Sequence, residues 1–420
     1  MASKLDPEKW QGIVVVAGDG LVYEVLNGMM MHANPPSVLK VPIGIIPAGS
    51  GNALFAAVID KAGEQPHKCT PLHAAFLLCK GGSQPIDLVS IVTPLRRIHS
   101  FLAITWGIIA DIDIESERFR WLGKPRFTIG TVIRILNLRR YRGTLSFLPV
   151  ADQAPYQHLL RPAPKPPKQR KQPKQMPRPR SMMDTSSARA AAAAGLNGEE
   201  EDDDTPALRR FQSLNADLST LPSSDGLAFA EEFIKEEGGG TEGSSSAEGA
   251  TAVKDQSSAH PQSNGDACWK SAGSQPSSPQ TPSNRYLPPG LADPLPEGWT
   301  TVDGDFVGIL ITYLSHIGED VNVWPDRRFD EGVISIQYIH FPVSRRNLAD
   351  FVTAIQTGRH LTLPFTKCVF VKAFRMVPRT RPGIITVDGE VIEYGPVQGE
   401  IMEHKPHIIF PTHLPTPTAK

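Results

Sequence analysis

The sequence predicts an α/β domain followed by an antiparallel β domain, with a long disordered insertion inside the second domain. Two strand–glycine turn–helix units occupy residues 12–59, a pattern typical of a parallel sheet covered by helices. Segments rich in β-branched residues and separated by turn signals lie on either side of residues 151–292. The residues between them are rich in Pro, Ser and charge, with too few large apolar groups to offset their ordering entropy.

The first strand–turn–helix unit is "GIVVVAGDGLVYEVLNGMM", residues 12–30. Its β-branched apolar run predicts a strand buried on both faces, and the apolar residues after the turn share one face of a helix. Gly18, Asp19 and Gly20 form the turn at the carboxyl end of the strand, where open α/β sheets bind ligands. The glycines let backbone N–H groups approach a phosphate. Taken alone, a plain turn without a ligand is an equal alternative.

The second unit is "VPIGIIPAGSGNALFAAVI", residues 41–59. A strand precedes a loop of small residues, and a helix follows the loop. Gly49, Ser50 and Gly51 can offer successive N–H groups to an anion, and Ser50 adds a hydroxyl. Two such loops within about thirty residues argue against chance, although they match neither a Walker A motif nor a G-x-G-x-x-G fingerprint.

Composition limits the class of protein. The 420 residues suffice for two or three domains, and a net charge of −1 predicts no bulk attraction to nucleic acid or membrane. A basic run at 165–180 and an acidic run at 199–204 predict a solvated linker, with a nuclear-import or anionic-lipid patch as the alternative. The cysteine spacing matches no zinc motif. Without a signal peptide or a long apolar run, a soluble intracellular protein is expected.

The second domain opens with "HSFLAITWGIIADIDI", which has strand-like composition. On a strand, four alternating carboxylates would share one face: Asp111, Asp113, Glu115 and Glu117. That face is either simply solvated or supplies a group that binds a cation, and the pattern leaves both open. Later in the chain, a helix is predicted between Ser344, as its N-cap, and Gly358, as its C-terminal stop.

Seven separated segments resemble the sphingosine kinase family, in order, over residues 12–150 and 293–402. They are "GDGLVYEVLNG", "PAGSGNAL", "WGIIADIDIESERFR", "RFTIGTVIRILNLRRYRGTLSFLP", "FDEGVISI", "GRH" and "ITVDGEVIEYGPVQG". The long insertion resembles the type 2 form of that family, and the wider family includes diacylglycerol and ceramide kinases. The resemblance implies a Rossmann-like α/β nucleotide domain and a β-sandwich lipid domain. It also implies transfer of the γ-phosphoryl of ATP, with Mg²⁺, to the primary hydroxyl of sphingosine, giving sphingosine 1-phosphate.

The resemblance also implies roles for individual residues. Asp19 takes the position of the catalytic base, and Asp388 that of a magnesium ligand. The nucleotide-binding positions are Gly18, Gly20, Glu24, Gly49, Ser50, Gly51, Asn52, Arg120, Arg126, Asp388, Gly389 and Glu390. Asp113 takes the position that holds the sphingoid headgroup, where a carboxylate would pair with an ammonium. The lipid-pocket positions are Ile108, Ile109, Ile112, Phe127, Thr131 and His360.

One departure concerns the beginning of the chain. The family starts with another strand and a glycine-rich loop of the N-P-x-x-G-x-G kind, whereas eleven residues precede the first strand here. The comparison predicts an N-terminally truncated nucleotide domain. The expected divisions are 1–88 for the nucleotide domain, 89–150 and 293–402 for the lipid domain, 151–292 for the insertion and 403–420 for a tail. A catalytically impaired lipid-binding or regulatory protein, and a kinase for ceramide or diacylglycerol, stay open as alternatives.

The basic apolar segment 126–143 matches the family's calmodulin-binding region. Basic apolar helices also bind anionic membrane surfaces, and the alternative is that much of this segment is core and lipid pocket. Ser213 follows Arg209 and Arg210, which is a weak signal for phosphorylation by a basophilic kinase. The expected location is cytoplasmic with peripheral membrane association, and nuclear entry is an alternative.

Overall fold

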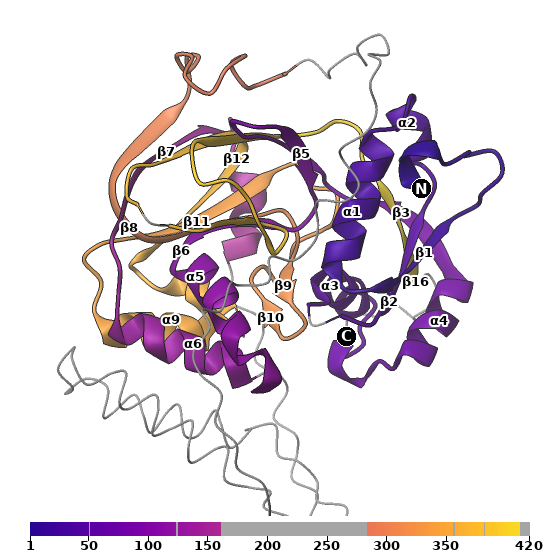
Figure 1. Ribbon diagram of the computed structural model, residues 1–420, viewed down its shortest axis with the longest axis horizontal. Helices are drawn as coiled ribbons and strands as arrows, with labels where there is room; N and C mark the ends of the chain where they lie inside the picture. Colours follow the sequence, from indigo (N-terminus) through magenta and orange to yellow (C-terminus); the bar gives the residue numbers. More distant parts are fainter. Residues whose placement is uncertain (50, 123–124, 161–283, 356–357, 382, 412–420) are drawn as a thin grey trace, which may run out of the picture.

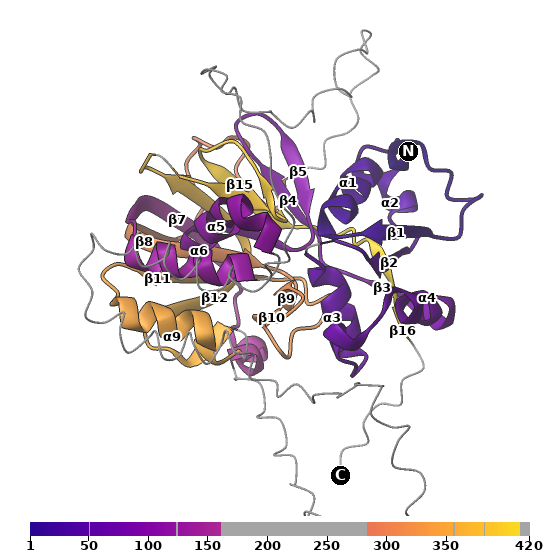
Figure 2. The same cartoon turned by 60° about the horizontal axis from the view of Figure 1, so that its bottom comes forward.

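The computed structural model describes residues 1–49, 51–122, 125–160, 284–355, 358–381 and 383–411. An α/β domain and a β domain lie side by side (Figures 1 and 2). Three sequence predictions fall outside the described residues: the hydroxyl of Ser50, the phosphorylation site Ser213 and the charged runs of the insertion. Among the described helices, none is long and apolar enough to cross a lipid bilayer.

The α/β domain is built on a four-stranded sheet with the order β1-β2-β16-β3. Strands β1 and β2 pair in parallel, β16 is parallel to β2, and β3 is antiparallel to β16. The strands are β1 (Ile13–Ala17), β2 (Ile43–Pro47), β3 (Gly81–Pro85) and β16 (His407–Pro411). The helices are η1 (Ala2–Lys4), α1 (Asp19–Met30), α2 (Pro35–Val38), α3 (Ala53–Lys61), η2 (Pro66–Lys68) and α4 (Pro71–Lys80).

The position of β16 corrects the expectation that residues 403–420 form a tail. Ile408 is fully buried and pairs with Ile43 in the centre of the first sheet. The chain therefore returns from the β domain to complete the sheet of the α/β domain. An apolar strand gains burial on both sides there, which a tail would forgo.

The prediction that β1 is buried on both faces is wrong. Val15 is buried, but Val14 and Val16 are 55% and 60% exposed. Within the described ranges, β1 is the edge strand of its sheet, and only the face carrying Val15 is covered. The run of β-branched residues therefore predicted the strand correctly, but not the exposure of one of its faces to solvent.

The β domain contains a ten-stranded sheet folded into a sandwich. The 13-residue strands β8 (Thr300–Thr312) and β12 (Thr366–Pro378) each pair with β11 (Ile334–His340) over one half and with β7 (Tyr141–Pro149) over the other. Each long strand thus takes part in both layers, with an apolar core between them. The remaining strands are β4 (Val89–Val92), β5 (Arg97–Ser100), β6 (Ala103–Gly107), β13 (Ile385–Val387), β14 (Glu390–Val391) and β15 (Val397–Ile401), with the small hairpin β9 (His316–Gly318) and β10 (Val321–Asn322) beside them.

Three helices gather along one side of the sandwich (Figure 2). They are α5 (Ile108–Glu115), α6 (Pro125–Leu136) and α9 (Arg345–Ile355), and the short helices of this domain are η3 (Ser116–Leu122), η4 (Ala154–Leu160) and η6 (Arg359–Thr362). They enclose an apolar cluster that reaches β8 and β11 through Val307 and Ile339. Helix α9 begins as predicted, because the N–H of Asn347 donates to Ser344 Oγ over 3.1 Å.

Helix α5 corrects the prediction of a strand at 108–115. Gly107 has a φ of +86°, and a Cβ there would lie 2.6 Å from the carbonyl oxygen of Val307. Only glycine tolerates this position, so the chain turns out of β6 and starts a helix. On a helix, Asp111 and Glu115 lie one turn apart, whereas Asp113 points to another side.

The insertion is shorter than the expected range 151–292. Residues 154–160 form η4, and residues 284–292 lie against the sandwich. Glu400 on β15 accepts hydrogen bonds from the N–H groups of Arg285, Tyr286 and Leu287. A buried carboxylate thus fixes the segment that leads into β8.

Replacing Gly107 by alanine is expected to lower the free energy of unfolding by about 2 kcal/mol or more, because the positive φ and the clash with Val307 add together. Gly63 is the matched control, since its φ is +80° but nothing lies within 4 Å of the added Cβ. Its alanine variant should lose only about 1 kcal/mol. Denaturant unfolding measures both, and equal losses would contradict the account of the strand-to-helix turn.

Candidate active site

The two glycine turns meet in direct backbone contact at the carboxyl ends of β1 and β2. The N–H of Asp19 donates to the carbonyl of Gly51 over 3.2 Å. A Cβ on Gly18 would lie 2.6 Å from that same oxygen, and a Cβ on Gly49 would lie 2.4 Å from the Cα of Gly18. Any larger side chain would push the turns apart. The structure therefore brings together the two loops that the sequence singled out.

Asp19 holds the second helix as well as the first turn. Its carboxylate accepts hydrogen bonds from the N–H groups of Ala53 (2.8 Å) and Leu54 (3.1 Å), the first two residues of α3. Burial raises the pKa of Asp19, and the two N–H donors oppose that shift. Asn52 closes the loop itself, because its side chain exchanges hydrogen bonds with the backbone of Gly49. Sequence reasoning missed this capping role of Asp19.

A hairpin of the β domain reaches the first glycine turn. Glu390, at the start of β14, places Oε1 3.2 Å from the position of a Cβ on Gly20. Gly389 forms the hairpin turn with a φ of +85° and open space around it. Glu390 is exposed, so its carboxylate is available beside the N-terminus of α1. This brings a residue from the far end of the sequence to the glycine turns.

Asp388 is turned inward and does not fit the predicted role of magnesium ligand. Its Oδ1 accepts hydrogen bonds from Ser100 Oγ (2.5 Å) and from the N–H groups of Leu102 (3.1 Å) and Ala103 (2.9 Å). Its Oδ2 accepts from the N–H of Phe101 (3.0 Å). Burial raises the pKa of Asp388 to about 6, against these hydrogen bonds. A magnesium ligand must present a carboxylate oxygen to the ion, and the oxygens of Asp388 are engaged in holding the segment before β6.

Asp113 is the uncommitted carboxylate of α5. Burial raises the pKa of Asp113 to about 6, the nearby Arg126 opposes the shift, and Glu117 and Glu390 add to it. Within the described part of the chain, no group donates a hydrogen bond to its side chain. Asp111, by contrast, is buried and accepts from Tyr141 and Arg139.

Arg126 lies between the acidic groups and the apolar region. Its side chain is buried, pairs with Glu117 and lies 4.3 Å from the ring centroid of Phe127. Arg120 lies in η3, and its side chain is outside the described part of the structure. Glu24 is exposed on α1. The structure therefore places Arg126 beside Asp113, and it leaves the nucleotide roles of Arg120 and Glu24 as predictions.

Four of the six predicted lipid-pocket residues lie at the apolar cluster enclosed by α5, α6 and α9. Ile108, Ile109 and Ile112 belong to it, and buried His360 lies 5.6 Å from the ring of Phe351 within it. Burial lowers the pKa of His360 to about 4, so the ring is neutral. On α6, Thr131 is buried with its hydroxyl on the carbonyl of Phe127, whose own side chain is 38% exposed.

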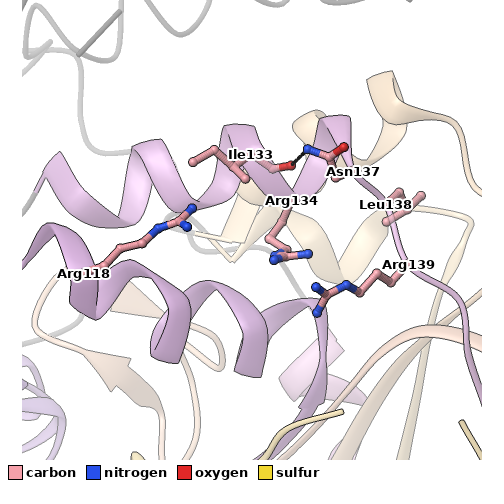
Figure 3. A pocket seen from close by; sticks show the side chains of 6 residues that line it. All are labelled: Arg118, Ile133, Arg134, Asn137, Leu138 and Arg139. Carbon is pink, nitrogen blue, oxygen red and sulfur yellow. Dashed lines mark hydrogen bonds between the residues drawn. The ribbon is translucent and has the colours of Figure 1, made fainter. Parts of the chain in front are cut away.

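Arg134 and Arg139 of segment 126–143, together with Arg118 of η3, line a depression between α5 and α6 with a cavity volume of about 530 Å³ (Figure 3). Arg134 pairs with Glu115, and Arg139 pairs with both Asp111 and Glu115. The buried apolar side chains of α6 are Ile129, Val132, Ile133, Ile135 and Leu136, and Tyr141 at the start of β7 is buried as well. Calmodulin binding stays a prediction, and it would require α6 to leave this packing.

Asn27 links the two domains through its side chain, and sequence reasoning missed it. Its side-chain amide donates to the carbonyl of His99 over 2.8 Å, and its Oδ1 accepts from the N–H of His99 over 2.9 Å. Helix α1 is thereby held against β5. An asparagine inside a helix is disfavoured by propensity, which was the available signal.

Known proteins are similar to this chain in sequence. Residues 1–91 match the diacylglycerol kinase catalytic domain. Sphingosine kinase 2 from Homo sapiens is 36% identical over 94% of this chain and 62% of its own length. The chain is therefore similar to sphingosine kinases over 94% of its length, and its first 91 residues match the catalytic domain of a lipid kinase family. Another relative, sphingosine kinase 1 from Homo sapiens, is 28% identical over 94% of this chain and 74% of its own length. The chain thus spans 62% of the human sphingosine kinase 2 that it matches.

Proposed function

We propose that this chain is a lipid kinase that transfers the γ-phosphoryl of ATP to the primary hydroxyl of sphingosine, giving sphingosine 1-phosphate. The observation that carries the proposal is the position of Asp113. This half-buried carboxylate has no hydrogen-bond donor in the described structure and neighbours Glu390, which contacts the first glycine turn. A small amino alcohol with an apolar tail suits a site with an anion-binding edge, a free carboxylate and an apolar cluster.

The glycine turns are the proposed phosphate site. The N-terminus of α1 and its dipole favour bound anions, and the second glycine turn lies in contact with this terminus. Arg126 supplies positive charge on the side of the lipid site. Magnesium, when bound, would neutralise charge on the phosphate oxygens, and the exposed Glu390 fits the role of its ligand better than Asp388 does.

The transfer needs a proton acceptor for the lipid hydroxyl. Its oxygen forms a bond to the γ-phosphorus while the bond to the bridging oxygen of ADP breaks, and the hydroxyl proton passes to a carboxylate. Asp19 is the proposed acceptor, because it belongs to the first glycine turn and contacts the second through the carbonyl of Gly51. Burial raises the pKa of Asp19, which makes its carboxylate a stronger base than that of an ordinary aspartate.

The substrate class follows from charge. An ammonium beside Asp113 would balance its carboxylate, whereas neutral diacylglycerol and ceramide would leave it unpaired in a half-buried site. The test uses the full chain with radiolabelled ATP, magnesium and sphingosine, ceramide or diacylglycerol in separate reactions. Label on sphingosine alone is expected. The proposal would be overturned if ceramide or diacylglycerol were labelled in preference to sphingosine. It would also be overturned if sphingosine bound but no lipid were labelled.

Changing Asp113 to asparagine is expected to weaken sphingosine binding about ten- to a hundredfold, because a charge-assisted contact is lost.

The affinity for sphingosine should also depend on pH. The pKa of Asp113 is raised to about 6 in the free protein, so the carboxylate is ionised above that pH and protonated below it. An aliphatic ammonium stays charged throughout this range. Sphingosine affinity of the parent should therefore fall as the pH drops below about 6, and the variant should lose this dependence. Asp350→Asn, an exposed position on α9, is the control. Equal affinities of parent and Asp113→Asn at pH 7.5 would contradict the prediction.

Changing Asp19 to asparagine is expected to lower kcat by about 10²–10⁴-fold, with smaller changes in KM. The variant should also lose stability, because an amide group would face the N–H groups that the carboxylate now accepts. Asn52→Ala is the matched control, since it removes hydrogen bonds from the same loop and keeps the carboxylate. It should retain turnover within about tenfold of the parent. Steady-state kinetics and thermal unfolding are measured for the parent, Asp19→Asn and Asn52→Ala. A kcat of Asp19→Asn within about twofold of the parent would show that Asp19 is not the base.

A further inference from the structure

A compact group of three potential metal ligands lies on the α/β domain, apart from the glycine turns. Glu64 follows α3, Cys69 follows η2, and His73 lies in the first turn of α4. The ligand atoms of these three side chains all lie within 4.8 Å of one another, and His73 Nε2 is 3.4 Å from Glu64 Oε2. Figures 1 and 2 both show α4 on the side of this domain that faces away from the β domain.

The backbone fixes two of the three ligands. Thr70 caps α4, because its Oγ1 accepts a hydrogen bond from the N–H of His73 over 3.2 Å. Cys69 directly precedes this cap, so the positions of Cys69 and His73 relative to each other are set by the start of the helix. Glu64 reaches them from the turn that ends α3. All three side chains are half-buried, which leaves them rotamer freedom and access from solvent.

Thiolate, imidazole and carboxylate are together the donor set of zinc. With zinc–ligand bonds of about 2.0–2.3 Å, ligand atoms in a tetrahedron are about 3.3–3.8 Å apart. The present separations come within about 1 Å of that spacing, and small side-chain rotations would close the difference. Cysteine spacing alone could not show this, because the ligands are of three types with the pattern E-x4-C-x3-H.

A nucleophilic role for Cys69 fits the site less well. A cysteine nucleophile requires a lowered thiol pKa. Burial and the neighbouring Glu64 raise the pKa of the Cys69 thiol to about 11. An ion pair between His73 and Glu64 is another explanation of the cluster. It would explain why those two side chains are close, but not why the Cys69 thiol lies beside them.

We propose that Glu64, Cys69 and His73 bind Zn²⁺, with water as the fourth ligand. As the metal binds, the thiol loses its proton to solvent and the sulfur becomes a thiolate ligand. The site would tie the connection between α3 and α4 to the first turn of α4. This inference is independent of the proposed kinase activity, since none of the three residues belongs to the candidate active site.

The test is titration of the full, metal-free chain under reducing conditions, with Co²⁺ as the spectroscopic probe and Zn²⁺ as its competitor. One equivalent of Co²⁺ is expected, with a sulfur-to-cobalt charge-transfer band and the intense visible bands of a tetrahedral site. Stoichiometric Zn²⁺ should abolish them. Thermal unfolding should shift to higher temperature with Zn²⁺, because the metal binds the folded chain.

Variants assign the ligands. Cys69→Ser should remove the charge-transfer band, and His73→Ala should weaken Zn²⁺ binding by more than the roughly 10- to 100-fold that loss of an outer-shell partner costs. The matched controls are Cys79→Ser at the other end of α4 and His67→Ala in η2, both exposed, and each should bind like the parent. Absence of a sulfur band in the parent, its persistence in a folded Cys69→Ser chain, or its loss in Cys79→Ser would overturn the proposal.

Discussion

The backbone contact between the two glycine turns is the constraint on which the rest of the site depends. Gly18 and Gly49 touch so closely that neither can carry a side chain. Asp19 then uses both carboxylate oxygens to hold the start of α3. One residue thus sets the separation of the N-termini of α1 and α3 at a single edge of the sheet. The proposed phosphate site needs no large side chain, which agrees with the small-residue composition of both loops.

The β domain contributes to this edge through two long-range connections. Asn27 pairs with the backbone of His99 on β5, and Glu390 reaches the turn at Gly20. The chain also crosses between the domains at 86–88 and at 402–406, where buried Asp87 pairs with Lys405 over 2.8 Å. These contacts hold Asp113 and the apolar cluster of α5, α6 and α9 in a defined position relative to the glycine turns. The proposed phosphoryl transfer depends on this relative position, because the lipid hydroxyl must lie next to the phosphate.

Local patterns predicted the strand–turn–helix units and the N-cap at Ser344, because each depends on neighbours in the sequence. The errors arose where distant residues decide. Strand β1 has an exposed face that its valines gave no hint of, and β16 completes a sheet whose other strands lie more than 300 residues earlier. At 108–115, the composition of the segment predicted a strand with its carboxylates on one face, but a positive φ at Gly107 starts a helix and separates Asp113 from Asp111 and Glu115. Likewise, the sequence identified Asp388 and Glu390 together in one acidic motif. Only the tertiary contacts show that Asp388 is buried and hydrogen-bonded, whereas Glu390 is exposed.

The central claim is that phosphate and ammonium groups bind one continuous site, at the glycine turns and at Asp113. The most direct measurement is a crystal structure of the full chain with sphingosine and a non-hydrolysable ATP analogue. We expect the sphingosine nitrogen within hydrogen-bond distance of the Asp113 carboxylate, its tail among the apolar residues of α5, α6 and α9, and the nucleotide phosphates on the N–H groups of the two turns. A headgroup bound away from Asp113, or phosphates bound away from both turns, would contradict the account.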